Sequence, residues 1–239
     1  MTNPLVTINI VVFNGEKYIR HCLKAVAKQS YPNIEVNIFD NNSNDRTREI
    51  AVSEFPALNL IPHPQNLGMW PGHEKALEHS HGEYTVALSV DVILDKNFVQ
   101  EAVEAFERHP KAGALQAKVY QYDLKDIDQG IQPVPVVVDT CGFQLSRSRR
   151  VKNIGHGETD NGQFGQEKEI FGIEGAVPIF RKNAFESCRV QGHIADPDFF
   201  WYGDDLDLAW RLRLFGWEEW YVPALVAYHD RSTTNCHSK

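Results

Sequence analysis

The chain has 239 residues, a formal net charge of −8 and 42% hydrophobic residues, so it can bury a sizeable core and is not expected to be a general nucleic-acid binder. It contains no run of about 18 apolar residues that could span a membrane, and its N-terminus lacks the basic start of a signal peptide. The four cysteines form no CxxC pair, which disfavours a disulfide framework or a structural zinc site. We therefore expect a cytoplasmic protein with reduced thiols and no nucleic-acid partner.

The first 120 residues alternate between strand and helix patterns. Concentrations of apolar and β-branched residues predict strands at 5–13, 34–40, 58–62, 84–89 and 112–120. Helical spacing and boundary signals predict helices at about 19–28, after "NNSND" with Ser43 or Asn44 as N-cap, from Pro71 to Gly82, and at 95–110. The alternation predicts an α/β fold with a mostly parallel central sheet flanked by helices, and ligands bind such sheets at the carboxyl ends of the strands.

After residue 120 the pattern changes. Residues 121–172 are rich in Gly, Gln, Asp and Pro and predict hairpins and loops, while 174–187 predict a strand and a short helix. "DDLDLAWRLRLFGW" predicts a helix with Leu206, Trp210 and Leu214 in a stripe and a stop at Gly216, and "EWYVPALVAYH" predicts a last strand. No repeat or linker divides the chain, so we expect one domain over 1–239, with a nucleotide-type half followed by a substrate-type half.

Two acids follow predicted buried strands. Asp40 ends the strand at 34–40, where its carboxylate could accept hydrogen bonds from a nucleobase or could simply cap an Asx turn. Asp91 follows the strand at 84–89 in "LSVD" and could be a cap or a ligand of a divalent cation. A cation that holds a diphosphate needs only one or two protein carboxylates, because phosphate and water oxygens complete its shell.

Three further acids lie at the predicted start of the helix in "FFWYGDDLDLAW". Helix geometry puts Asp204 and Asp207 on one side and separates Asp205 from them. The helix dipole alone would favour acids there, but the surrounding aromatic residues also suit a pocket rim with a carboxylate general base. Asp207 and Arg211, spaced i and i+4, predict a supporting ion pair, and His229 after the last strand is either structural or a metal ligand.

Together these segments resemble family 2 glycosyltransferases with the GT-A fold. The matching stretches, in order, are "VVFNGEKYIRHCLKAVAKQSYPNIEVNIFDNNSNDRT", "NLG", "HGEYTVALSVD" and "FFWYGDDLDLAWRLRLFGWEEWYVPALVAYH". "DTCGFQLSRSRR" and "GIEGAVPIFRKNAFE" are most similar to bacterial rhamnosyltransferases, which use dTDP-rhamnose to build cell-wall or O-antigen polysaccharides. The resemblance implies a single GT-A domain over 1–239, with a nucleotide-binding half at 1–120 and an acceptor-binding and catalytic half at 121–239.

The resemblance also implies a role for each matching residue. Asp205 matches the catalytic base, and Asp91 matches the metal-binding acid of the DxD motif, with Ser89 in place of the first acid and His229 as a second metal ligand. The implied donor-binding residues are Phe13, Asn14, Glu16, Asp40, Asn66, Gly68, Ser89, Val90 and Asp91. The implied acceptor-binding residues are Glu174, Trp201 and Asp204, although Glu174 could instead cap a turn.

These roles predict an inverting glycosyltransferase that needs Mg²⁺ or Mn²⁺. Its donor would be a nucleotide-diphosphate sugar, with dTDP-rhamnose expected and a UDP-sugar as the alternative, and its acceptor a saccharide or lipid-linked saccharide. The competing hypotheses are a non-catalytic sugar-nucleotide binding module, favoured by Ser89, and a nucleotidyltransferase, disfavoured because "VVFNGEKYIR" is no Gly-rich basic phosphate loop.

A basic run, "RSRRVK", contains Arg147, Arg149, Arg150 and Lys152. It could contact an acceptor phosphate or an anionic membrane face, or it could be the solvated surface of a hairpin. Peripheral membrane contact, and a location at the inner face of the membrane, therefore remain expectations beside the cytoplasmic one.

Overall fold

The computed structural model describes residues 3–196, 198–199 and 203–231. Its strands are β1 (Val6–Val12), β2 (Ile34–Asp40), β3 (Asn59–Pro62), β4 (Tyr84–Ser89), β5 (Val92–Leu94), β6 (Ala112–Gln121), β7 (Val138–Thr140), β8 (Phe143–Leu145), β9 (Val151–Asn153), β10 (Lys168–Glu169), β11 (Ile179–Arg181) and β12 (Glu218–His229). Its helices are α1 (Ile19–Ala27), α2 (Thr47–Glu54), α3 (Met69–Leu77), α4 (Phe98–Arg108), α5 (Leu124–Asp128), α6 (Lys182–Ser187) and α7 (Asp204–Leu214).

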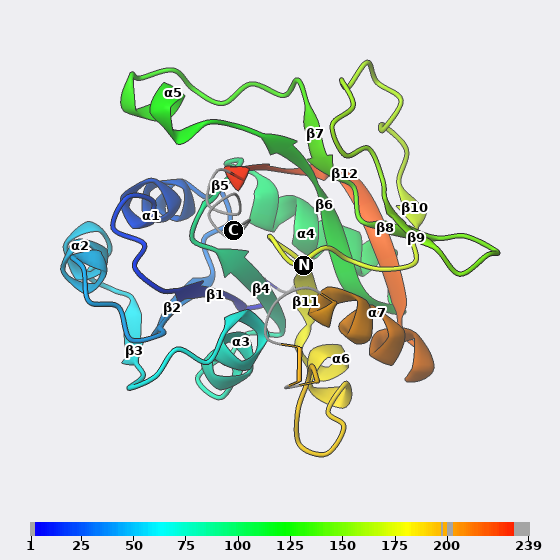
Figure 1. Ribbon diagram of the computed structural model, residues 1–239, viewed down its shortest axis with the longest axis horizontal. Coiled ribbons are helices and arrows are strands. Elements are labelled where there is room, and N and C mark those ends of the chain that lie inside the picture. Colours follow the sequence, from blue (N-terminus) through cyan, green and yellow to red (C-terminus); the bar gives the residue numbers. More distant parts are fainter. Residues whose placement is uncertain (1–2, 197, 200–202, 232–239) are drawn as a thin grey trace.

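One twisted sheet runs through both halves of the chain, in the order β10-β12-β6-β11-β4-β1-β2-β3 (Figure 1). The strands of the first half pair in parallel as predicted, from β3 through β2 and β1 to β4. The second half makes the sheet mixed, because the short strand β11 lies antiparallel between β4 and β6, while β12 runs parallel to β6. The α/β class is as expected, and the antiparallel pairs involve strands that follow Pro- and Gly-rich connections.

The two faces of the sheet are buried by different helices (Figure 1). Residues alternate between the faces: Val86 and Leu88 of β4 pack in the same apolar cluster as α1 and α4, while Ala87 between them packs in the cluster of α3, α6 and α7. Every residue of β1 except the half-buried Val11 is buried, as expected of a central parallel strand covered on both faces.

The register brings the predicted ligand-binding positions to one edge of the sheet. Val12 of β1 pairs with Asp40 of β2, and Val11 pairs with Ser89 of β4. The loops that follow β1, β2 and β4 therefore begin next to one another at this edge of the sheet. The antiparallel pairing of β12 with β5 then carries His229 back to Val92, next to Asp91.

Three local predictions differ from the structure. The third helix ends at Leu77, before the predicted stop at Gly82. The second helix begins at Thr47, not after Ser43 or Asn44, because the Ser43 hydroxyl accepts a hydrogen bond from the Asn14 amide instead. The stripe on α7 is turned outward: Trp210 and Leu214 are exposed, and Leu208 and Leu212 are buried against the sheet. Among the described residues, no helix is long and apolar enough to cross a membrane.

Candidate functional site

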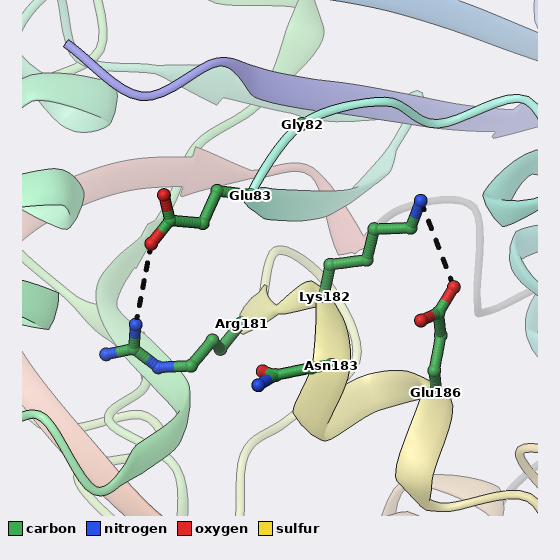
Figure 2. A pocket seen from close by; sticks show the side chains of 6 residues that line it. All are labelled: Gly82, Glu83, Arg181, Lys182, Asn183 and Glu186. Atoms are coloured by element: carbon green, nitrogen blue, oxygen red, sulfur yellow. Dashed lines mark ion pairs between the residues drawn. The ribbon is translucent and has the colours of Figure 1, made fainter. Parts of the chain in front are cut away.

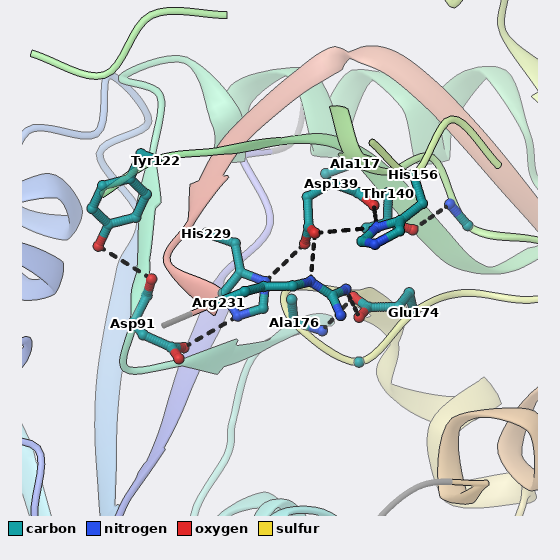
Figure 3. A network of polar contacts seen from close by, with 12 residues as sticks. Asp91, Ala117, Tyr122, Asp139, Thr140, His156, Glu174, Ala176, His229 and Arg231 are labelled. Carbon is teal, nitrogen blue, oxygen red and sulfur yellow. Dashed lines mark hydrogen bonds and ion pairs between the residues drawn. The ribbon is translucent and has the colours of Figure 1, made fainter. Parts of the chain in front are cut away.

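Asp91 and His229 meet at the carboxyl edge of the sheet (Figure 3). The Nε2 atom of His229 lies 3.6 Å from Oδ1 of Asp91, and both side chains are largely buried. The backbone of Asp91 is fixed because its carbonyl accepts hydrogen bonds from the Asp230 amide and the Tyr122 hydroxyl. Residues from distant parts of the chain thus face one another, as the sequence predicted for a shared ion.

Asp139 is the second partner of His229. Its buried carboxylate lies 2.9 Å from Nδ1 of His229 and also accepts a hydrogen bond from Arg231. Arg231 in turn donates to Oε1 of Glu174 at 2.9 Å. The result is a continuous polar network from Asp91 through His229, Asp139 and Arg231 to Glu174 (Figure 3).

The network favours positive charge at His229. Burial alone would lower the pKa of His229, but the contacts with Asp139 and Asp91 raise it to about 10. Burial would raise the pKa of Asp139, yet the hydrogen bond and charge of His229 and the charge of Arg231 hold it below its usual value. Two carboxylates therefore converge on one imidazole, and their negative charge stabilises a cation at this position.

These side chains fit a divalent cation bound through few protein ligands. Asp139 can accept the Nδ1 proton of His229, so that a cation replacing the proton on Nε2 would coordinate this nitrogen, an arrangement common behind metal-binding histidines. In the described part of the chain no group of three or more His, Cys, Asp or Glu side chains is arranged to hold an ion. Asp91 and His229 would therefore supply two ligands, and ligand oxygens and water the rest.

Asp205 is held at both carboxylate oxygens. Oδ1 accepts a hydrogen bond from the indole of the buried Trp70 at 3.1 Å, and Oδ2 accepts from the Gly175 amide at 3.0 Å. Asp205 lies in the first turn of α7, and Trp70 lies in the first turn of α3 across the same face of the sheet. Its carboxylate is half-buried and fixed in orientation, which a general base requires.

The carboxyl groups next to Asp205 favour their protonated forms. Burial and the charge of Asp205 raise the pKa of Asp204 to about 7. The pKa of Glu174 is likewise raised by burial and by the charge of Asp205, against the opposing charges of His229 and Arg231. Glu174 also caps the turn before Ala176, whose amide donates to Oε2. The turn-cap interpretation of Glu174 therefore agrees with the structure, and its acceptor-binding role stays a prediction.

The loop after β1 is tied to the loop after β2. Asn14 donates its amide to Ser43, and Glu16 donates its amide to Asp45 at 3.1 Å. Asn14 adopts a left-handed backbone conformation (φ 50°), while the ring of Phe13 is 48% exposed at the edge of the sheet. This leaves the Phe13 ring available to a ligand on a loop that is otherwise fixed.

Asp40 lies beneath these loops and is fully buried. Its carboxylate accepts hydrogen bonds from the Ser43 amide and from Nε of Arg48, the latter at 2.6 Å. Asp40 therefore bonds the amide three residues on, not two as in the Asx turn considered for it, and it also carries an ion pair. A nucleobase would reach the Asp40–Arg48 pair as a unit, not a lone carboxylate.

Asn66 and Gly68 lie in the turn before α3. The Asn66 side chain accepts a hydrogen bond from the Gly68 amide, and Gly68 has φ 87°, a conformation that favours glycine. The buried Asn41 anchors the turn by donating to the Gly68 carbonyl and accepting from the Leu67 amide. The turn is thereby fixed beside Asp40.

Ser89 and Val90 connect β4 to Asp91. The Ser89 amide donates to the Ala176 carbonyl, so the "LSVD" segment is joined to the segment that carries Glu174. Val90 packs on the core beside Gly15, where an added Cβ would lie 3.2 Å from a Val90 methyl. Trp201, the third predicted acceptor residue, lies outside the described residues.

A separate cavity of about 330 Å³ lies at the opposite end of β4 (Figure 2). It is lined by Gly82, Glu83, Arg181, Lys182, Asn183 and Glu186. Its two cations are already paired, Arg181 with Glu83 at 3.8 Å and Lys182 with Glu186 at 3.9 Å. The cavity is therefore distinct from the site around Asp91 and Asp205.

Comparison with known proteins assigns the chain to a family. The family model described as "Glycosyl transferase family 2" matches residues 7–188, which include β1 to β4 and Asp91. The chain belongs to glycosyl transferase family 2. This confirms the resemblance predicted from the sequence motifs.

Curated relatives of this family 2 chain are named as a rhamnosyltransferase, a polysaccharide synthase and a putative glycosyltransferase. The N-acetylglucosaminyl-diphospho-decaprenol L-rhamnosyltransferase of Mycobacterium tuberculosis is 22% identical over 97% of this chain and 78% of its own length. The poly-beta-1,6-N-acetyl-D-glucosamine synthase of Staphylococcus epidermidis is 22% identical over 92% of this chain and 48% of its own length. The putative glycosyltransferase EpsH of Bacillus subtilis is 28% identical over 42% of this chain and 30% of its own length. The chain thus matches less than half of the latter two relatives.

Solved structures show that the family 2 chain has the GT-A fold. GalNAc-T7 with UDP, GalNAc and Mn²⁺ has a TM-score of 0.71 at 13% identity, covering 95% of this chain and 44% of that one. The mannosyltransferase PcManGT of Pyrobaculum calidifontis with GDP-Man and Mn²⁺ has a TM-score of 0.67 at 19% identity, covering 96% and 57%. TarS of S. aureus has a TM-score of 0.69 at 17% identity, covering 95% and 37%.

Several site residues of this family 2 chain were not found by sequence reasoning. Asp139, Arg231 and Trp70 contact predicted site residues through side chains, and Asn41 anchors a predicted loop. One feature of the sequence could have indicated Asp139 as a site residue, because this acid directly follows the apolar run "VPVVV". No such feature indicated Trp70, because an indole beside a turn is more often core.

Proposed function

We propose that this family 2 chain is an inverting, metal-dependent glycosyltransferase. It would transfer a sugar from a nucleotide-diphosphate donor to a hydroxyl of a saccharide or lipid-linked saccharide. The observation that carries the proposal is the meeting of Asp91 and His229 at 3.6 Å, on the same edge of the sheet as Ser89 and Asp40. What supports the proposal is that two carboxylates converge on this histidine at the ligand-binding edge of the sheet, where they can stabilise a cation.

In this proposal the chain forms a single GT-A domain over 1–239. The half at 1–120 binds the donor, with Phe13 stacking on or flanking the nucleoside and with Asn14, Glu16 and the Asp40–Arg48 pair completing the pocket. Asn66 and Gly68 shape the adjoining turn, and Ser89 and Val90 lie along the path to the diphosphate. The half at 121–239 binds the acceptor and carries out catalysis.

Asp91 and His229 would hold Mg²⁺ or Mn²⁺, with Asp139 orienting the imidazole. When bound, such an ion neutralises the charge that develops on the departing diphosphate. The supporting observation is the Asp91–His229–Asp139 chain of contacts. Two of the solved neighbours, GalNAc-T7 and PcManGT, contain Mn²⁺ together with a nucleotide or a nucleotide sugar.

Asp205 would act as the general base. Trp70 and Gly175 hold its carboxylate, which would remove the proton from the acceptor hydroxyl as that oxygen attacks the anomeric carbon. A single displacement of the nucleotide diphosphate inverts the configuration, so no covalent intermediate on the protein is needed. Asp204, Glu174 and Trp201 would contact the acceptor, and protonated Asp204 could donate a hydrogen bond to it.

The expected donor is dTDP-rhamnose, with a UDP-sugar as the alternative. Support for rhamnose comes from the L-rhamnosyltransferase relative, which matches 97% of this chain. Support for UDP-sugars comes from the poly-N-acetylglucosamine synthase relative and from the neighbours bound to UDP and UDP-GlcNAc. The expected location is the cytoplasm or the inner face of the membrane.

The proposal is tested with Asp205→Asn. This change keeps the size of the side chain but removes the basic carboxylate, and it leaves one oxygen to accept from either Trp70 or Gly175. Transfer to a hydroxyl acceptor should fall by at least about 100-fold while donor affinity is retained. Asp126→Asn, the same substitution at an exposed carboxyl on α5, is the matched control and should keep most of the activity. Transfer at the normal rate by Asp205→Asn would mean that the base is a different residue.

A non-catalytic binding module is the second candidate, because Ser89 replaces the first acid of the family motif. This candidate predicts that the protein binds nucleotide sugars but neither hydrolyses nor transfers them with Mg²⁺ or Mn²⁺. Release of nucleotide diphosphate from the donor, above the rate without enzyme and abolished by Asp205→Asn or by chelation, would exclude it.

A further inference from the structure

The β8–β9 hairpin is strongly basic and projects from the body of the protein (Figure 1). Residues 143–153 contain no Asp or Glu, and Arg147, Arg149, Arg150 and Lys152 are all exposed. None of the four forms an ion pair with a carboxylate of the described residues. The turn itself is ordered by Ser146, whose carbonyl and hydroxyl accept the amides of Arg149 and Arg150. On a chain with net charge −8, this is a local concentration of uncompensated positive charge.

The outward side of α7 is apolar where a surface helix is usually polar. Trp210 is 46% exposed, Leu214 is 79% exposed and Phe215, at the end of the helix, is 51% exposed. The opposite side of α7 is already buried in the core through Leu208 and Leu212. The exposed residues therefore form a second apolar face, of which only Trp210 has an aromatic contact, with Phe171, among the described residues.

The hairpin and the outward side of α7 belong to one surface. The ring of Trp210 meets the edge of Phe171 with centroids 4.9 Å apart, and the Phe171 amide donates to the carbonyl of Phe143 in β8. A cavity of about 390 Å³ between them is lined by residues of the hairpin, including Leu145, and by Arg213 of α7. We call the exposed residues Arg147, Arg149, Arg150, Lys152, Trp210, Leu214 and Phe215 the hairpin–α7 surface.

We propose that the hairpin–α7 surface docks on the surface of an anionic lipid bilayer. The argument is charge complementarity combined with apolar anchors. Lys and Arg near an anionic bilayer each contribute favourable electrostatic energy, and Trp, Leu and Phe insert at the level of the headgroups. Neither signal alone gives stable attachment, whereas a polybasic segment beside inserted apolar side chains does. A protein partner would need a complementary acidic groove, for which the structure offers no indication.

The docked orientation would serve the proposed transfer reaction, and this step rests on the proposed function. Asp205 lies in the first turn of α7 and Leu214 is its last residue, and the 11 residues of the helix span about 16 Å. Because the docked residues lie on the outward side of α7, the helix would lie along the bilayer, with the base within about one helix length of the docked residues. An acceptor anchored by a lipid diphosphate would present its sugar hydroxyl within that distance, whereas a freely soluble acceptor would gain nothing.

Docking is tested by co-sedimentation of the whole protein with vesicles. Vesicles of phosphatidylcholine alone are compared with vesicles that also contain phosphatidylglycerol, at low and at high salt. We expect binding to the anionic vesicles only, weakened at high salt because exposed charges are screened. Equal binding to both vesicle types, or binding to neither, overturns the proposal.

Two variants separate charge from apolar insertion. Arg147→Ser/Arg149→Ser/Arg150→Ser should weaken binding to anionic vesicles by at least about tenfold. Trp210→Gln/Leu214→Gln should weaken it severalfold and should also abolish the blue shift of tryptophan fluorescence expected on docking. Both changes are on exposed side chains, so circular dichroism and melting temperature should be unchanged, which keeps the test valid.

The control variant Lys24→Ser/Lys28→Ser/Lys96→Ser removes three exposed charges from the α1 side of the molecule. It should bind anionic vesicles like the unaltered protein, and an equal loss would mean that only overall charge matters, against the proposal. The alternative is that the protein self-associates through this surface. In that case sedimentation velocity would show a concentration-dependent dimer that Leu214→Gln abolishes, and the protein would not bind vesicles, which would overturn the proposal. Donor hydrolysis without vesicles is measured in parallel, so failure to dock is distinguishable from failure of the proposed activity.

Discussion

At the scale of single residues, the most constrained group is the Asp205 carboxylate. Both of its oxygens accept hydrogen bonds from groups that the fold cannot easily move, a buried indole and a backbone amide. The Gly175 position is also close, since an added Cβ there would lie 2.9 Å from Oδ1 of Asp205. Such fixation restricts the carboxylate to one orientation, so a substrate hydroxyl does not have to organise it.

Trp70→Phe tests this fixation. The ring is retained in the core, but the hydrogen bond to Oδ1 is lost, so we expect kcat for transfer to fall roughly tenfold and donor affinity to stay unchanged. Steady-state kinetics with separate measurement of donor binding would check it. Trp217→Phe, which removes an indole hydrogen bond to Ser187 away from the site, is the control and should leave kcat unchanged. An equal loss in both variants would point to general damage to the core.

Asp204 should make stability depend on pH. Because burial and the Asp205 charge raise its pKa to about 7, the folded protein binds a proton there that the unfolded chain has released above about pH 4. Its contribution to the free energy of unfolding is therefore lost as pH rises from about 4 to 7. We compare the free energy of unfolding of Asp204→Asn with that of the unaltered protein, by urea unfolding at pH 5 and at pH 8. The difference in favour of the variant should be larger at pH 8 by on the order of 1–2 kcal/mol.

The same comparison on Asp126→Asn, an exposed carboxyl on α5, provides the control. Its effect should be small and equal at the two pH values. A pH-independent effect of Asp204→Asn would show that Asp204 is ionised in the folded protein throughout this range.

At the scale of elements, α7 is positioned by Arg211. Its buried guanidinium pairs with Asp207 at 2.8 Å, as the i and i+4 spacing predicted, and also donates to the carbonyls of Cys188 and His193. The helix that carries Asp205 is thereby attached to the loop after α6. The sequence could predict the pair within the helix, but it could not predict the two carbonyl acceptors.

Arg211→Met should lower the free energy of unfolding by about 2–4 kcal/mol, because Asp207 and two backbone carbonyls lose their donor in a largely buried place. Urea denaturation measures the change. Arg46→Met, which breaks an exposed pair with Glu49, should cost less than about 1 kcal/mol. If the two variants cost the same, Arg211 does not position α7.

The elements themselves show what sequence patterns can and cannot predict. The strands β1 to β4 and the helices between them follow from local periodicity, and their parallel pairing follows from the alternation of strand and helix. The antiparallel position of β11 between β4 and β6 could not be predicted, because the sequence of a three-residue strand does not indicate which strands it pairs with. Asp139 was missed for the same reason: its contact with His229 depends on β7 pairing with β6.

At the scale of the whole molecule, the proposed donor site is complete only when both ends of the chain are in place. Phe13 and Asp40 come from the first strands, Asp91 from the middle and His229 from the last strand, and β12 reaches Asp91 only through its antiparallel pairing with β5. A ligand that bridges these parts binds the folded state and not the unfolded one. Its binding must therefore raise the melting temperature of the entire fold.

A thermal-shift series with dTDP-, UDP- and GDP-sugars, each with and without Mn²⁺, uses this coupling to identify the donor. At about 100 times its Kd a ligand adds about 2.7 kcal/mol, which for a domain of this size corresponds to a rise of roughly 5–10 °C. We expect the largest rise with dTDP-rhamnose or a UDP-sugar plus Mn²⁺, and a smaller one when a chelator is present. Asp91→Asn, which keeps the size of the side chain but removes its charge, should lose the Mn²⁺-dependent part of the rise and keep the nucleotide part. Stabilisation by GDP-sugars alone would contradict the donor assignment, and an Mn²⁺ effect that survives in Asp91→Asn would contradict the metal site.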